Sequence, residues 1–155
     1  MIKKILIFIS ITLLIGACDY KPLYSINENS NFNIVILEIN GDKNINNFLK
    51  NGLNIYKDKK SKKNYEVSLT TSYSKSILAK DKTANTTDYK LSVFVEMSLI
   101  DLSNDSIEKK ISFNEDLNIK KDTNNFNQAN YENISKINLA EVILEKIILF
   151  LNNQK

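Results

Sequence analysis

The chain has 155 residues with a net charge of +3, a length that supports one domain and a charge that indicates no nucleic-acid partner. It has no histidine, and its sequence contains no nucleophile–base pair, glycine-rich phosphate loop or metal-spaced cluster. We therefore expect a protein that is not an enzyme and that holds no metal or dissociable cofactor.

Residues 1–17 have the pattern of a secretory signal peptide that ends at a lipid attachment site. Two lysines precede an apolar stretch, residues 5–15, which is too short to cross a bilayer as a permanent helix. Gly16 and Ala17 stand directly before Cys18, as at the cleavage site of a bacterial lipoprotein. There the Cys18 thiol would receive a diacylglycerol and its freed amine a further acyl chain such as palmitate, and three chains anchor a protein firmly.

Cleavage before Cys18 leaves 138 of the 155 residues, with 19 basic against 18 acidic side chains and a net charge of +1. Because Cys18 is the only cysteine, the mature chain forms no internal disulfide and must be stabilised by its core. The predicted organisation is a signal peptide at 1–17, a polar lipidated tether at 18–31 and a single domain at 32–155.

The domain is predicted to begin with a strand and a helix. Residues 32–39 are apolar on both faces, as in a strand that is covered on both sides, and Gly41 and Asp42 end it. Apolar residues at helical spacing then predict a short helix over 45–56.

Three segments with a period of two follow, over residues 65–77, 89–99 and 107–119, and they predict an antiparallel meander with one apolar face. Turns are expected at 80–82 and 104–105. The outward side chains of the first segment are small and hydroxylated, which suits either solvent or a polar lumen. They are Ser68, Thr70, Ser72, Ser74 and Ser76.

A wide apolar stripe predicts a closing helix over 137–151 that covers the sheet. The fold class is therefore α+β, with the order β-α-β-β-β-α and two helices on one face of a four-stranded, mostly antiparallel sheet.

Five apolar residues are expected outside the core and are candidates for contact with a partner protein. Val142 and Leu149 lie on the helix face opposite the stripe, whereas Val35, Leu37 and Phe94 point to the sheet face away from the helices. Scattered exposed apolar residues are also ordinary on a protein surface, and that reading stays open.

The tether, Cys18-Asp19-Tyr20-Lys21-Pro22-Leu23-Tyr24, resembles the Cys-Gly-aromatic-x-Pro-Leu-Tyr start of the LPS-assembly lipoprotein family, LptE, particularly its alphaproteobacterial branch. The order of elements, the long serine-rich strand and the closing amphipathic helix are also similar. The resemblance implies a subunit lodged inside the outer-membrane barrel LptD, where it assists assembly of the barrel and delivery of lipopolysaccharide to the cell surface.

Asp19 stands where the family usually has glycine, and it resembles the inner-membrane retention signal of enteric-type sorting. The expected location is the periplasmic face of the outer membrane, with inner-membrane retention as the alternative. The alternative function is a membrane-anchored periplasmic chaperone or pilotin-like adaptor for a protein client, which would need an exposed apolar groove.

The predicted strand directions bring two loops, after 65–77 and after 107–119, to the end of the molecule opposite the tether. Lipopolysaccharide carries phosphates, which lysine binds as a point charge. We assign the lysines of these loops to lipopolysaccharide contact, with solubilising charges as the alternative: Lys80, Lys82, Lys120 and Lys121. The lysine-rich segment 57–63 is expected at the tether end, near the membrane surface.

Overall fold

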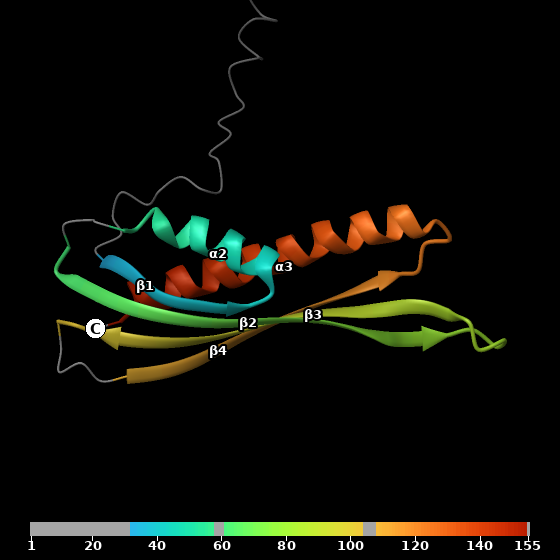
Figure 1. The fold of residues 1–155 in the computed structure, drawn as a ribbon. Coiled ribbons are helices and arrows are strands. Elements are labelled where there is room, and N and C mark those ends of the chain that lie inside the picture. Colours follow the sequence, from blue (N-terminus) through green and yellow to red (C-terminus); the bar gives the residue numbers. More distant parts are fainter. Residues whose placement is uncertain (1–31, 58–60, 104–107, 155) are drawn as a thin grey trace, which may run out of the picture.

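The computed structural model describes residues 32–57, 61–103 and 108–154. Four strands and two helices follow one another in the predicted order (Figure 1). Their bounds are β1 Phe32–Gly41, α2 Lys43–Asn54, β2 Lys63–Lys80, β3 Thr86–Asp101, β4 Glu108–Lys120 and α3 Asn125–Asn152.

The strands form one sheet in the order β1-β2-β3-β4, and only the first pair is parallel. The predicted α+β class with a mostly antiparallel sheet is confirmed. Alternation along the strands separates the two faces of the sheet. The predicted serine and threonine row of β2 lies on the face away from the helices, whereas Val67 and Leu69 point into the core.

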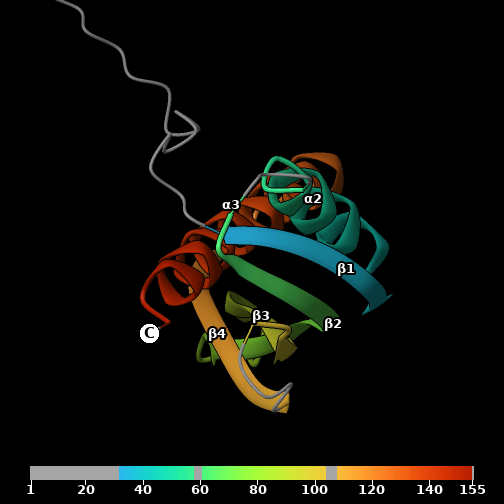
Figure 2. The same ribbon diagram turned by 90° about the vertical axis from the view of Figure 1, so that its left-hand side faces the viewer.

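Both helices cover the same face of the sheet (Figures 1 and 2). α2 packs on β1, and α3 packs on β3 and β4 and against α2. Gly52 of α2 allows this close approach, because a Cβ atom there would lie 2.3 Å from a methyl carbon of Leu144. The core lies between these layers and includes Ile45 and Leu49 of α2, Val93 of β3 and Ile143 of α3, all fully buried.

Each helix begins at a side chain that accepts hydrogen bonds from its first turn. Asp42 accepts from the N–H groups of Asn44 and Ile45, at 2.9 and 3.1 Å. Asn124 accepts from the N–H groups of Phe126 and Asn127, at 2.9 and 3.2 Å. Such caps satisfy donors that the helix itself cannot.

The start of α3 differs from the sequence prediction. The apolar stripe begins at Ile137, but the helix begins at Asn125, because Asn124 caps it there and polar contacts hold its first turns. The first turns carry almost no apolar residue toward the sheet, so periodicity alone could not locate them.

The prediction that the first strand is covered on both faces was wrong. β1 is one of the two edge strands of the sheet, and only its inner face packs against the helices. Val35, 38% exposed, and Leu37, 56% exposed, are outside the core. A register irregularity between Ile36 and Glu38 accommodates Leu37 as an extra residue, which is common in edge strands.

Candidate functional site

The turn between β2 and β3 and the loop between β4 and α3 lie at the same end of the molecule, the right-hand end in Figure 1, which we call the distal end. Lys120 stands opposite Asp88 in the sheet, and the N–H of Lys121 donates to the carbonyl of Thr87 at 2.8 Å. The four lysines of the sequence analysis are therefore all at this end: Lys80, Lys82, Lys120 and Lys121.

These four lysines are exposed, and among the described residues none of them forms an ion pair. The carboxylates nearby are held by their own loops. Asp81 accepts from the hydroxyl and N–H of Thr83, at 2.7 and 2.8 Å, and from the N–H of Asn85, at 2.9 Å. The Thr83 hydroxyl, with these N–H groups, holds the pKa of Asp81 below its ordinary value.

Two shallow pockets, of about 630 and 530 Å³, open at the distal end and share the residues from Lys120 to Thr123. The larger also involves Tyr131 of α3, and the smaller involves Thr86 and Thr87 of β3. Each pocket is lined by two lysines and hydroxyl and amide groups against one carboxylate, that of Asp122, and this excess of donors suits an anionic group. Lys80 and Lys82 lie outside both pockets.

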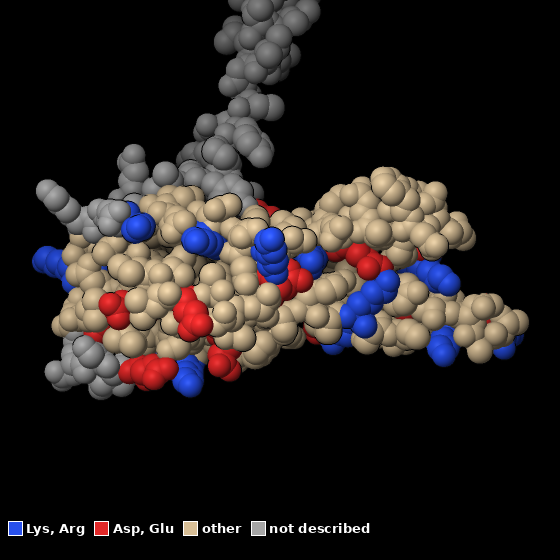
Figure 3. Space-filling view, viewed as in Figure 1, with Lys and Arg blue, Asp and Glu red and all other residues tan. Residues whose placement is uncertain are grey.

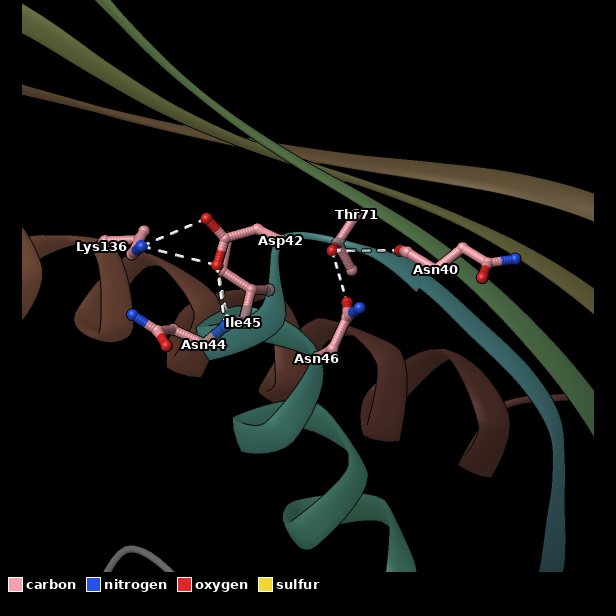
Figure 4. Close-up of polar contacts among 7 residues, drawn as sticks. All are labelled: Asn40, Asp42, Asn44, Ile45, Asn46, Thr71 and Lys136. Atoms are coloured by element: carbon pink, nitrogen blue, oxygen red, sulfur yellow. Dashed lines mark hydrogen bonds and ion pairs between the residues drawn. The ribbon is translucent and has the colours of Figure 1, made fainter.

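A polar cluster in the middle of the molecule joins the end of β1, the start of α2 and α3 (Figure 4). Lys136, 8% exposed, places its ammonium 3.2 Å from a carboxylate oxygen of Asp42. Burial would raise the pKa of Asp42, but the hydrogen bonds from Ile45 and Lys136 and the lysine charge hold it below its ordinary value. Beside this pair, the hydroxyl of Thr71 donates to the side-chain oxygen of Asn46.

A second ion pair, between Lys75 of β2 and Glu132 of α3, lies nearer the distal end. Gln128 donates to the same carboxylate at 2.7 Å, and the Lys75 ammonium lies 3.9 Å from the centre of the Tyr89 ring. Tyr73 lies between the two pairs. Its burial is the main cause that raises its pKa, and the negative charges of Glu132 and Asp42 raise it further. These contacts fix α3 across the sheet.

The five apolar candidates for partner contact are all exposed, but they lie on two opposite sides of the molecule. Phe94, 38% exposed, is on the outer face of the sheet, whereas Val142, 39%, and Leu149, 61%, are on the outer side of α3. Tyr131 and Ile134, both about half exposed, are on that side of α3 too. The sequence analysis missed these two because they precede the apolar stripe.

Cys18, the proposed lipid attachment site, lies outside the described residues. Within 32–57, 61–103 and 108–154, no helix is long and apolar enough to span a membrane. The same ranges contain no group of three or more potential metal-ligating side chains.

The sequence analysis also missed Thr86, Thr87 and Asn125, which line the smaller distal pocket. Residues of this kind are common in turns and give no signal of their own. Buried Lys136 had a signal, since it directly precedes the apolar stripe of α3.

Solved structures of bacterial lipoproteins have a similar fold. Rare lipoprotein B from Shewanella oneidensis matches with a TM-score of 0.53 and 16% identity, over 73% of this chain and 93% of that one. A minor lipoprotein from Acinetobacter baumannii matches with a TM-score of 0.51 and 12% identity, over 77% and 92%. No protein-family model and no curated protein matches the chain. At these identities the similarity establishes a shared fold.

Proposed function

We propose that this protein is a lipid-anchored subunit of the lipopolysaccharide translocon at the periplasmic face of the outer membrane. It occupies an LptD-type β-barrel, assists assembly of that barrel and delivers lipopolysaccharide to the cell surface, with no enzymatic step. The observation that carries the proposal is the lipoprotein start, Cys18 to Tyr24, ahead of a domain with the fold of other bacterial lipoproteins.

The surface of the domain supports this role. A barrel lumen is polar, so a protein inside it needs a polar surface that forms hydrogen bonds. The outer face of the sheet has that character along β2 from Ser68 to Ser76. On β3 and β4 it carries the exposed ion pair of Lys90 and Asp116, at 2.7 Å.

The distal lysines are the proposed contact for lipopolysaccharide. They lie at the end opposite the first residue of β1, where the tether joins the domain. Their ammonium groups have no carboxylate partner among the described residues, and the Thr86 and Thr87 hydroxyls lie beside two of them. The Thr87 hydroxyl already donates to the Asp88 carboxylate at 2.7 Å, so the ammonium groups and the Thr86 hydroxyl are the donors that would bind a phosphate group.

Purification of the full-length protein from detergent-solubilised membranes tests the proposal. We expect a large outer-membrane β-barrel as a stoichiometric partner, and membrane fractionation should recover both proteins in the outer membrane. A preparation that contains no barrel, or a protein confined to the inner membrane as Asp19 would allow, would refute this function.

The alternative, a membrane-anchored adaptor for a protein client, is favoured by one feature. An apolar pocket of about 310 Å³ lies between the helices, lined by Phe48, Asn51, Gly52, Ile55 and Leu144. It is large enough for one or two side chains of a client. A soluble periplasmic protein as the stoichiometric partner in the same purification would support this alternative.

A further inference from the structure

Strand β2 extends well beyond the strand that pairs with its outer edge. β1 lies beside β2 as far as Gly41, which stands opposite Thr71, whereas β2 continues to Lys80. The chain leaves the sheet there because Asp42 caps α2 and is held by Lys136 of α3. Among the described residues, no strand takes the place beside β2 after Thr71.

The backbone groups that face this open edge can be identified. The carbonyl of Thr71 points toward β1, since it accepts from the N–H of Asp42. Strand alternation then directs the N–H and C=O groups of Tyr73, Lys75 and Ile77 to the same side. Unpaired backbone groups along an edge are a template for another strand. The register breaks after Ile77, so the regular part of the open edge spans Tyr73 to Ile77.

The side chains around the edge indicate which strand would fit. On the inner face, Lys75 forms an ion pair with Glu132, and Lys136 forms one with Asp42. An inserted strand therefore needs no charged side chain on that face. The outer face is a row of serines. At the distal end of the edge, Lys80 and Lys82 have no carboxylate partner among the described residues. Figure 3 shows charged side chains along the seam between α3 and the β2–β3 hairpin.

We propose that an extended segment of the partner barrel adds to β2 at Tyr73–Ile77, in line with β1. The inserted segment has small polar side chains on its outer face and an acidic side chain near Lys80, which leaves Lys82, Lys120 and Lys121 for lipopolysaccharide. This inference rests on the proposed function, and it names the surface by which the two proteins join. Backbone hydrogen bonds give such a strand its affinity, and the neighbouring side chains select it.

A second copy of this chain fits the edge poorly. An antiparallel pair of β2 edges centred on Ser76 would set Lys80 of one copy opposite Ser72 of the other. The turn Asp81–Asn85 of the first copy would then meet the end of β1 and the start of α2 in the second. A separate strand that ends or turns away near Tyr73 meets no such obstacle.

The test compares two substitutions at Lys75 in the full-length, membrane-extracted protein. Lys75→Ala removes the ion pair with Glu132 but keeps the N–H group, whereas Lys75→Pro removes both. Proline is tolerated in an edge strand where its nitrogen faces outward, so both variants should fold. We expect Lys75→Ala to co-purify with as much barrel as the wild type. The amount of barrel that co-purifies with Lys75→Pro should fall about tenfold or more, because the inserted strand loses a backbone hydrogen bond and its alignment.

Ser74→Pro is the structural control, since the N–H of Ser74 faces β3, and it should lower the urea midpoint of unfolding. Should Lys75→Pro lower that midpoint too, hydrogen exchange of the wild-type complex decides. The amides of Tyr73, Lys75 and Ile77 should exchange rapidly in the free protein and slowly in the complex with the barrel.

The outcomes separate this inference from the proposed function. Suppose that the wild-type protein binds the barrel, that Lys75→Pro binds it as well as Lys75→Ala does, and that these amides exchange equally fast with and without the barrel. The edge is then not the junction, although the proposed function stands. If no barrel is found with the wild type, both fail. If the open-edge amides are protected in a dimer of this chain that Lys75→Pro dissociates, the occupant is a second copy and the inference is wrong.

Discussion

At the scale of single residues, the ion pair of Lys136 and Asp42 joins elements that are distant in the sequence. Asp42 ends β1, caps α2 and binds α3, so one carboxylate fixes three elements. Its folded pKa lies below its ordinary value, so the folded state binds fewer protons than the unfolded chain near pH 4. The stabilisation from this group is present above about pH 4 and is lost as the pH falls through the folded pKa.

Lys136→Met tests this contact, because methionine keeps the apolar stem of the lysine and removes its charge. We expect the free energy of unfolding at pH 7 to fall by about 1–3 kcal/mol, since a partly buried carboxylate loses its partner. Urea titrations at pH 7 and pH 3 should differ less in the variant than in the wild type. Lys90→Met breaks an exposed pair and should lower the free energy of unfolding much less. Equal losses in the two variants would contradict this account.

At the scale of elements, α3 has two apolar sides with different roles. Its inner side carries the core residues Ile143 and Ile147, both fully buried. Its outer side carries Val142 and Leu149, which contact solvent in the isolated chain. Single exposed apolar residues are ordinary, but Tyr131 and Ile134 lie on this side of α3 as well, so that side is a candidate for contact with the proposed partner barrel.

Substitution of both outer residues, Val142→Ser and Leu149→Ser, separates the two roles. The free energy of unfolding should change by no more than about 0.5–1 kcal/mol, because the side chains are exposed, while the yield of co-purified barrel should fall. Ile143→Ser is the matched control and should cost about 2–5 kcal/mol. A double variant that is destabilised as much as the control would assign the outer residues to the core.

At the scale of the whole molecule, the lysines of the distal end and those of the opposite end are separated by the length of the sheet (Figure 1). The opposite end holds the start of β2, where Lys63 donates to the carbonyl of Gln154. The proposed function therefore uses the two ends differently: one carries the anchor and meets the membrane surface, and the other meets the sugar phosphates of lipopolysaccharide.

Reversal of the four distal lysines to glutamate should reduce lipopolysaccharide binding by about tenfold or more while urea unfolding stays unchanged, because phosphate contacts become repulsive. Wild-type binding should also weaken as salt is raised. The control reverses four exposed lysines of the opposite end, which changes the net charge equally: Lys57, Lys62, Lys109 and Lys110. Equal loss of binding in both variants would show that only total charge matters.

Anchoring is predicted to depend on one residue of the whole chain, Cys18. Cys18→Ala should leave the signal peptide uncleaved or release the protein from membranes, because the acyl chains have no other attachment point. Membrane fractionation and the mass of the mature protein measure this. A variant that is cut at the same position and stays as firmly bound would show that lipid on Cys18 is not the anchor.

The sequence by itself determined the order of the elements, the apolar side of β2, β3 and β4, and the end at which the four distal lysines gather. These features follow from local periods of two and 3.6 residues and from the connections between successive strands. Only the tertiary structure decided that Lys136 binds Asp42, 94 residues away, and that β1 leaves one edge of β2 open after Thr71. The reason is physical: an ion pair and the length of a strand pairing depend on where the chain leaves the sheet, and that point is fixed by contacts between residues distant in sequence.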